Sequence, residues 1–324
     1  MSQVINRKPE FDILKGILII FVVIGHSSIH IPYINFFWFH MPAFFMITGY
    51  LTKKWLTPKD IYIAIKYKDH TIWNRIGKYI FPYLSYSALF FILFQPESLL
   101  KNLVRVLYGG VNNTTGYSYP FWYINALFIA TLTIGGGKLF KQNKSNALIL
   151  LIIWILLHCN IMKLLPIPLP WGMDTALGAV IFLCIGNVAK EIYSKKWHWY
   201  LLILPFIFII FNEYASLHYK LNMKSMVYDH FILDLCVPVF FTYFFYKVSI
   251  ILSHTQGFSY LLSYLGTCSM TIYFTHAAIL SLTRKELQWN DATGVVSAIV
   301  IGVLLHTLFK HFRITRILFI GNLK

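Results

Sequence analysis

The sequence predicts an all-α, polytopic membrane protein, and three observations lead to this prediction. First, 57% of the 324 residues are hydrophobic and 12% are charged, whereas soluble domains carry about 25% charged residues. Second, the apolar residues form runs long enough to cross a bilayer as helices. Third, the charged residues gather in the short segments between these runs. We therefore expect one membrane domain over residues 1–324, embedded in a lipid bilayer.

Ten apolar segments are candidate transmembrane helices. They cover residues 11–30, 35–51, 78–95, 120–136, 147–163, 174–189, 199–216, 229–249, 264–283 and 293–310. Several are short or contain proline, which is tolerated in a membrane where neighbouring helices cover the backbone. The first segment has no small-residue cleavage site behind it, so we expect it to be retained as a span.

The distribution of lysine and arginine predicts the orientation of the chain. With the N-terminus in the cytoplasm, the cytoplasmic segments hold 20 of the 28 Lys and Arg residues and the opposite side holds 7. The positive-inside rule therefore favours both termini in the cytoplasm. The same rule accounts for the net charge of +16, so we do not expect a nucleic-acid partner.

Two loops and the cysteines carry further signals. Segment 52–77 holds more Lys and Arg than any other cytoplasmic segment, and we expect a short amphipathic helix in it along the membrane surface. Segment 96–119 contains the turn-rich sequence GGVNNTTGYSYP, and we expect it to form a lid or to contact an acceptor. The four cysteines lie in apolar runs without a CxxC pair, and the histidines lack metal-binding spacing. Neither a disulfide framework nor a metal site is therefore expected.

Residues 11–26, FDILKGILIIFVVIGH, combine an apolar run of membrane length with three ionisable side chains. Lys15 and His26 are eleven residues apart, and at ~100° per residue they lie on one stripe of a helix. At ~1.5 Å per residue they are roughly 16 Å apart along the axis, about half of a bilayer core. Asp12 shares the face of Lys15. Because ionisable groups inside a span are costly and usually functional, this alignment favours a functional role for His26.

The predicted topology sorts the other polar residues of the spans by depth. The outer half holds, besides His26, the residues His40, His276, Trp122, Asn125, Asp174 and Asp234. The inner side holds Lys15, Arg75 and Lys78. Simpler explanations exist for some of them, since interfacial water suits Asp174 equally well and the positive-inside bias alone explains Arg75 and Lys78. We interpret His158 and His306 as packed, hydrogen-bonded residues of the bundle.

These residues carry a resemblance to a known family. The stretch DILKGILIIFVVIGH at 12–26, followed by FHMPAFFMITGYL at 39–51, resembles the signature of the acyltransferase-3 family of integral membrane acyltransferases. With its lysine at position 15, this stretch is most similar to the fucose 4-O-acetylase-like branch of the family. Further similar segments follow in order, so that the resemblance covers nearly the whole chain: NRIGKYIFPYLSY at 74–86, PFWYINALF at 120–128, WGMDTALGAVIFLCIGN at 171–187 and GTCSMTIYFTHAAI at 266–279.

The resemblance implies transfer of an acyl group, commonly acetyl from acetyl-CoA, to a hydroxyl of a cell-envelope or secreted carbohydrate such as capsule or exopolysaccharide. It implies a multi-pass protein of the bacterial cytoplasmic membrane. On this reading His26 is the general base or the acyl carrier, with Asp174, Asp234 or a second histidine (His40 or His276) to orient it. Lys15, Arg75 and Lys78 then bind the phosphates of acyl-CoA. Trp122, Asn125 and Asp234 are the candidate contacts to the acceptor.

A transporter or exporter of a glycan or a lipid-linked sugar is the alternative function. Ionisable residues near the middle of the membrane also suit a proton-coupled carrier. Carriers of this kind are commonly built from repeated halves, and the sequence shows no such repeat. The sequence therefore favours the enzyme, and it does not predict an oligomeric state.

Overall fold

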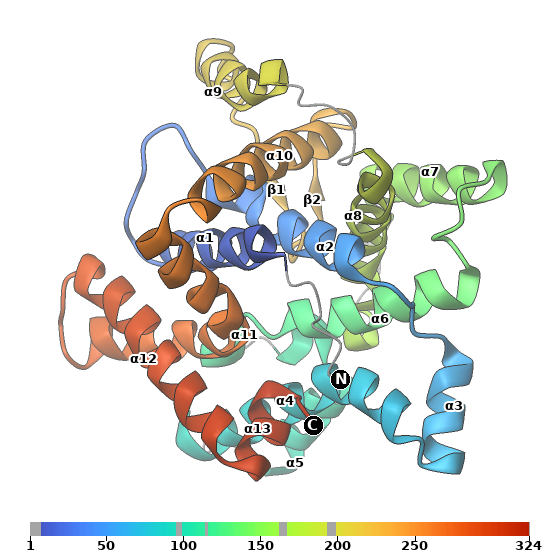
Figure 1. Cartoon of the computed structure of the whole chain (residues 1–324), viewed down its shortest axis with the longest axis vertical. Helices are drawn as coiled ribbons and strands as arrows, with labels where there is room; N and C mark the ends of the chain where they lie inside the picture. The colour runs from blue at the N-terminus through green and yellow to red at the C-terminus, as the bar shows by residue number, and fades with distance from the viewer. Residues whose placement is uncertain (1–7, 95–98, 114–115, 162–166, 193–198, 324) are drawn as a thin grey trace.

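The computed structural model describes residues 8–94, 99–113, 116–161, 167–192 and 199–323, and helices dominate them (Figure 1). The α-helices are α1 Pro9–Gly25, α2 His40–Leu51, α3 Pro58–Tyr67, α4 His70–Phe94, α5 Leu99–Tyr108, α6 Trp122–Gly137, α7 Lys144–His158, α8 Met173–Ile192, α9 Leu204–Tyr214, α10 Leu233–Ser253, α11 Gln256–Lys285, α12 Asp291–His311 and α13 Arg313–Ile320. Five 3₁₀ helices join some of them: η1 Phe36–Trp38, η2 Gly110–Asn113, η3 Gly116–Ser118, η5 Pro170–Gly172 and η6 Trp199–Ile203. The strands of these residues form one antiparallel hairpin, β1 Leu221–Asn222 and β2 Val227–Tyr228.

The predicted all-α class is confirmed, and each of the ten candidate spans overlaps one α-helix: α1, α2, α4, α6, α7, α8, α9, α10, α11 and α12. The ends of two spans, at residue 95 and at residues 162–163, lie outside the described residues. Within the described ranges, five helices are long and apolar enough to cross a membrane, namely α4, the 170–190 segment of η5 and α8, α10, α11 and α12. Four apolar helices, α2, α6, α7 and α9, are shorter, and α1 has 17 residues. A membrane protein is therefore supported, and the number of ten crossings stays a prediction.

Helix α4 begins earlier than the hydrophobic pattern predicts, at His70 instead of residue 78. Asp69 explains the difference, because its Oδ1 accepts hydrogen bonds from the backbone N of Thr71 (2.8 Å) and Ile72 (3.1 Å) and caps the helix. The amphipathic helix expected in segment 52–77 is α3. Thr57 and Asp60 cap its start reciprocally, each side chain bonding to the backbone N of the other.

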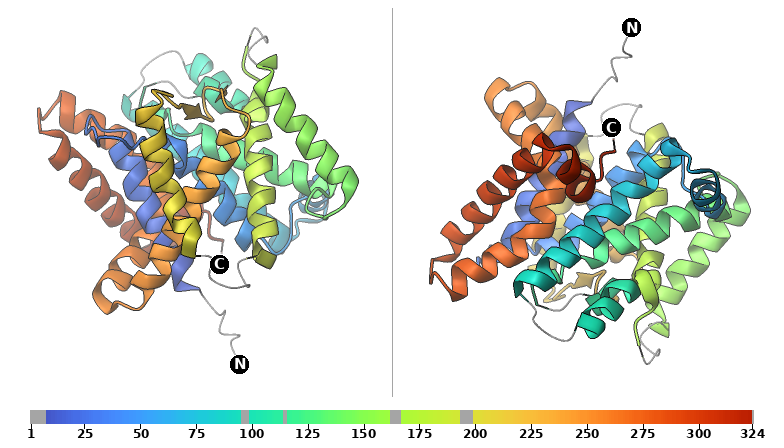
Figure 2. Two further views of the ribbon diagram at one scale, coloured as in Figure 1. Left: turned by 90° about the horizontal axis from the view of Figure 1, so that it is seen from above. Right: turned by 90° about the horizontal axis from the view of Figure 1, so that it is seen from below.

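Helix α1 lies in the middle of the molecule, where it packs against α11, α10 and α2 (Figure 1). Helix α2 packs in turn on α8, while α12 and α13 lie against α11 and α4. Figure 2 shows that α1 begins and the chain ends at one end of the bundle, whereas the β1–β2 hairpin lies at the opposite end. Helix α1 therefore runs from the end with the termini toward the hairpin.

Reciprocal glycine contacts hold the central helices close together. A Cβ on Gly16 of α1 would lie 2.1 Å from the Leu262 carbonyl oxygen of α11, and a Cβ on Gly266 of α11 would lie 1.9 Å from the Asp12 carbonyl oxygen of α1. Glycines at such contacts let two helix backbones approach each other, as in many membrane proteins. A Cβ on Gly49 of α2 would likewise lie 2.0 Å from a backbone oxygen of α8. These contacts fix the registers of α1 against α11 and of α2 against α8.

We expect Gly266→Ala to lower the stability of the folded protein by about 1–3 kcal/mol, because the new methyl group forces α1 and α11 apart. The measurement is thermal unfolding of the purified protein in detergent. Gly257→Ala is the matched control on the same helix, since no atom lies within 4 Å of a Cβ at that position. Equal melting temperatures for the two variants would contradict the proposed helix contact.

Candidate active site

Three histidines from different helices meet near the hairpin end of the bundle. His26 directly follows α1, His40 opens α2, and His276 lies in α11. The ring centroid of His26 is 5.1 Å from that of His276 and 6.3 Å from that of His40. The structure therefore brings together the three imidazoles that the sequence assigns to the outer half of the membrane.

Each of these imidazoles has Nδ1 within hydrogen-bonding distance of a backbone carbonyl one turn earlier in the chain. The acceptors are the carbonyl oxygens of Val22 for His26 (2.8 Å), of Phe36 for His40 (2.5 Å) and of Tyr273 for His276 (2.7 Å). Because a carbonyl oxygen can only accept, this network assigns the proton of each neutral ring to Nδ1. Nε2 is then unprotonated, and it is the atom that can take a proton from a hydroxyl group.

The end of α1 explains the position of His26. The backbone N of His26 still bonds to the Val22 carbonyl (3.2 Å), so this residue keeps the register of the helix. Ser27 Oγ donates to the carbonyl oxygen of Ile24 (2.7 Å), which satisfies one of the acceptors left at the helix end. Since α1 is unbroken from Pro9 to Gly25, the roughly 16 Å rise expected between Lys15 and His26 applies to this structure.

The three rings differ in access. His26 is partly exposed, whereas His40 and His276 have no exposed surface. Nε2 of both buried rings lacks a hydrogen-bond partner among the described residues. A buried acceptor without a partner is costly to maintain in a folded protein. The cluster thus presents one reachable imidazole backed by two buried nitrogens that can still accept hydrogen bonds.

Tyr119 and Lys224 complete the cluster from two segments outside the helices. The ring of Tyr119, which lies between η3 and α6, has its centroid 5.0 Å from that of His26. Lys224, in the turn of the β1–β2 hairpin, places its Nζ 5.4 Å from the centroid of the Tyr119 ring. Burial raises the pKa of Tyr119, so its phenol stays protonated, and burial of the Lys224 ammonium lowers its pKa.

Sequence reasoning did not select these two residues. Tyr119 belongs to segment 96–119, for which the sequence predicts an acceptor contact, and this was the one available signal. Lys224 counted only toward the charge of an outer loop. Neither residue lies in a segment with a periodic hydrophobic pattern. Their positions close to His26 depend on tertiary packing, which the spacing of residues in the sequence does not predict.

Asn125 and Asp174 bond to backbone groups of a different region. The Oδ1 of Asn125 accepts from the backbone N of Gly110 (3.2 Å) and holds the 109–110 turn against α6. Asp174 accepts from the backbone N of Leu169 (3.2 Å) and of Thr175 (2.7 Å) at the start of α8. No described contact connects either residue with the three histidines. Trp122 is buried at the start of α6.

Asp234 forms a second polar site, where α7 ends and α10 begins. Its Oδ2 lies 3.1 Å from Nε2 of His158, and it also accepts from the backbone N of His230 (3.0 Å). His158 Nδ1 faces the Trp154 carbonyl oxygen at 2.9 Å. Asp234 and His158 therefore form a buried, hydrogen-bonded pair that joins α7 to α10. The sequence predicts a packed His158 but does not identify Asp234 as its partner.

The three cations expected at the inner side contact different partners. Lys15 pairs with Asp12 at 3.3 Å and stays partly exposed. Arg75 bonds to the Lys54 carbonyl (3.0 Å) and lies 3.8 Å from Asp60, so it ties α4 to the segment around α3. The Lys78 ammonium lies 4.8 Å from the centroid of the neighbouring Tyr79 ring. The described contacts do not join them into one cluster.

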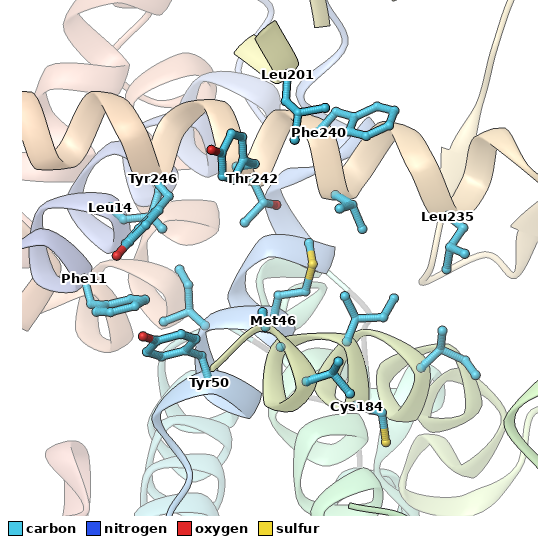
Figure 3. Close-up of a pocket in the computed structure, with 18 of the residues that line it drawn as sticks. Phe11, Leu14, Met46, Tyr50, Cys184, Leu201, Leu235, Phe240, Thr242 and Tyr246 are labelled. Atoms are coloured by element: carbon cyan, nitrogen blue, oxygen red, sulfur yellow. The ribbon is translucent and has the colours of Figure 1, made fainter. Parts of the chain in front are cut away.

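A cavity of about 500 Å³ lies between α1, α2, α8 and α10 (Figure 3). Its lining is apolar, with side chains such as Phe11, Met46, Leu235 and Phe240, and Lys247 is the one charged residue among the described residues that line it. None of the three clustered histidines lines this cavity. Its lining suits a hydrocarbon chain better than a donor with several phosphates, so the histidine cluster is the candidate site of chemistry.

Comparison with known proteins identifies the family of the chain. Residues 8–312 match a family described as an acyltransferase domain, which is nearly the whole chain. The chain is also similar to the nodulation protein NolL of Mesorhizobium japonicum, with 24% identity over 340 residues that cover 93% of this chain and 84% of NolL. No solved structure matches the chain.

Proposed function

Because the chain belongs to the acyltransferase-3 family, we propose that it is a membrane O-acyltransferase that moves an acyl group, in most cases acetyl, from cytoplasmic acyl-CoA to a hydroxyl of a cell-envelope carbohydrate. The proposal places it in the bacterial cytoplasmic membrane. The observation that supports it most is the cluster of His26, His40 and His276, whose hydrogen bonds leave Nε2 free to act as a base. The fucose 4-O-acetylase-like branch stays a prediction from the sequence.

The proposed reaction uses His26 because it is the reachable ring of the cluster. Its Nε2 removes the proton of the acceptor hydroxyl while the oxygen attacks the thioester carbonyl. The carbon–sulfur bond then breaks, the ester forms, and the departing sulfur takes the proton from the imidazolium as CoA thiol. A covalent variant, in which Nε2 first carries the acyl group, uses the same atom. Tyr119, which stays protonated next to His26, is placed to donate a hydrogen bond to the acceptor.

Transfer across the membrane requires the donor to reach from the cytoplasmic side to the cluster. In this proposal α1 covers the path, with Lys15 in the N-terminal half of the helix and His26 directly after its last residue. An extended pantetheine arm is of the same order of length as the roughly 16 Å rise between them. We propose that Lys15 binds a donor phosphate while the thioester lies near His26.

Lys15→Ala is expected to weaken acyl-CoA binding about ten- to a hundredfold. The reason is that a charge-assisted hydrogen bond contributes roughly 1.5–3 kcal/mol. The measurement is direct donor binding to the purified, folded protein. Asp12→Asn separates the two possible roles of Lys15, because it breaks the 3.3 Å ion pair but keeps the cation. If Lys15 only holds α1 in place, Asp12→Asn weakens binding as much as Lys15→Ala does; if Lys15 binds the donor, Asp12→Asn leaves the affinity unchanged.

The function itself is tested by mass spectrometry of the host glycan with and without the gene. We expect acyl groups on the glycan to disappear with the gene and to return with a plasmid copy. If the protein is instead an exporter, loss of the gene lowers the amount of exported glycan while the acyl groups per sugar repeat stay normal. That second result would contradict the proposed transferase.

A further inference from the structure

The β1–β2 hairpin brings a lysine to the mouth of the histidine cluster. Lys224 lies in the turn between the strands, and its Nζ is 5.4 Å from the centroid of the Tyr119 ring. That ring centroid is 5.0 Å from the centroid of His26. The ammonium of Lys224 and the imidazole of His26 are therefore no more than about 10 Å apart.

The charge of Lys224 has no acidic partner in the part of the chain that the structure describes. Its side chain is half-buried, and the ion pairs of the described residues do not include it. The neighbouring cation, Arg284, differs because Asp291 neutralises it at 2.7 Å. The Tyr119 ring compensates part of the desolvation of Lys224, since a cation over an aromatic ring gains about 0.5–2 kcal/mol. A half-buried ammonium with no carboxylate beside it favours an anion supplied by a ligand.

We propose that Lys224 binds an anionic group, a phosphate or a carboxylate, that the acceptor carries close to the hydroxyl deprotonated by His26. This inference rests on the proposed transferase function and specifies its substrate class as an anionic glycan. The separation between Lys224 and His26 limits the anion to the acylated sugar or to its neighbour. The hairpin is thereby a recognition element for the acceptor, and the donor does not contact it.

The test compares Lys224→Met with Lys220→Met in transfer from acetyl-CoA to unacylated glycan, purified from the host without the gene. Lys220 immediately precedes the same hairpin and is exposed, so it controls for a general loss of positive charge. Lys224→Met is expected to raise KM for the glycan about ten- to a hundredfold. The KM for acetyl-CoA is expected to stay unchanged, and Lys220→Met should behave like the wild type. Lys224→Arg, which keeps the charge, should recover most of the glycan affinity.

Treatment of the glycan identifies the anion. One sample is stripped of phosphate with hydrofluoric acid, and in a second the carboxylates are reduced to alcohols. One of these treatments should raise the wild-type KM as much as Lys224→Met does, and it should have no further effect on that variant. A wild type insensitive to both treatments, or an unchanged glycan KM in Lys224→Met, would overturn the inference. Failure of the wild type to acylate native glycan would instead contradict the transferase function itself.

Discussion

His26→Ala is expected to lower the rate of acylation by about 10²–10⁴-fold, the range typical for removal of a general base. His26 is the partly exposed ring of the histidine cluster, and its Nδ1 bond to the Val22 carbonyl leaves Nε2 unprotonated. His40 and His276 are fully buried in this structure, so His26 is the first candidate for contact with the acceptor. The measurement is the number of acyl groups per sugar repeat at matched protein levels, with donor binding expected to survive.

Two further variants separate proton transfer from packing. His26→Gln keeps hydrogen-bonding ability but cannot take a proton at neutral pH, so it should be nearly as inactive as alanine. His306→Gln is the control for loss of a buried histidine elsewhere, because His306 bonds to Thr271 Oγ1 (3.0 Å) and has no described contact with the three clustered histidines. We expect it to retain acylation. Acylation close to wild type in His26→Gln would exclude His26 as the base and transfer that role to His40 or His276.

Asp234→Asn is expected to destabilise the folded protein by about 3–5 kcal/mol. The carboxylate is fully buried, and its removal leaves Nε2 of His158 without the group that it contacts at 3.1 Å, which is the costly way to break a buried pair. Asparagine can still accept the hydrogen bond from the His230 backbone N. Thermal unfolding in detergent measures the effect.

The double variant Asp234→Asn with His158→Phe provides the control. In the His158→Phe background no imidazole is left without its partner, so Asp234→Asn should cost less stability there than in the wild type. Strict additivity of the two single effects would show that the residues do not interact. An unchanged melting temperature for Asp234→Asn would contradict the buried pair between α7 and α10.

Much of the architecture could be predicted because it depends on local patterns. Ten apolar runs predict ten helices, and the direction of each run gives the depth of His26, His40 and His276. Depth alone cannot show that the rings approach to 5–6 Å, because the neighbour relations among helices are set by packing. The close approach of α1 to α11 depends on Gly16 and Gly266, and an isolated glycine in an apolar run does not identify its partner.

The acidic candidates show a different limit of sequence reasoning. A carboxylate at the start of a span can cap its helix, pair with a cation or bind a substrate, and all three roles place it at the same depth. The structure gives Asp174 backbone amides and Asp234 a histidine as neighbours. His158 was interpreted as packed because its partner is 76 residues further along the chain. Such pairs depend on which helices are adjacent, and the hydrophobic pattern does not encode this.

The glycine contacts fix the relative positions of the helices that carry the three imidazoles, but not the side chains of Tyr119 and Lys224. Helices α1, α2 and α11, which carry the imidazoles, are fixed backbone to backbone or against α8, so their relative positions tolerate little change. Tyr119 and Lys224 come from segments outside these helices and are partly exposed. We therefore expect exchange of these two side chains to change the selectivity for the proposed acceptor, while the positions of the three imidazoles stay as they are.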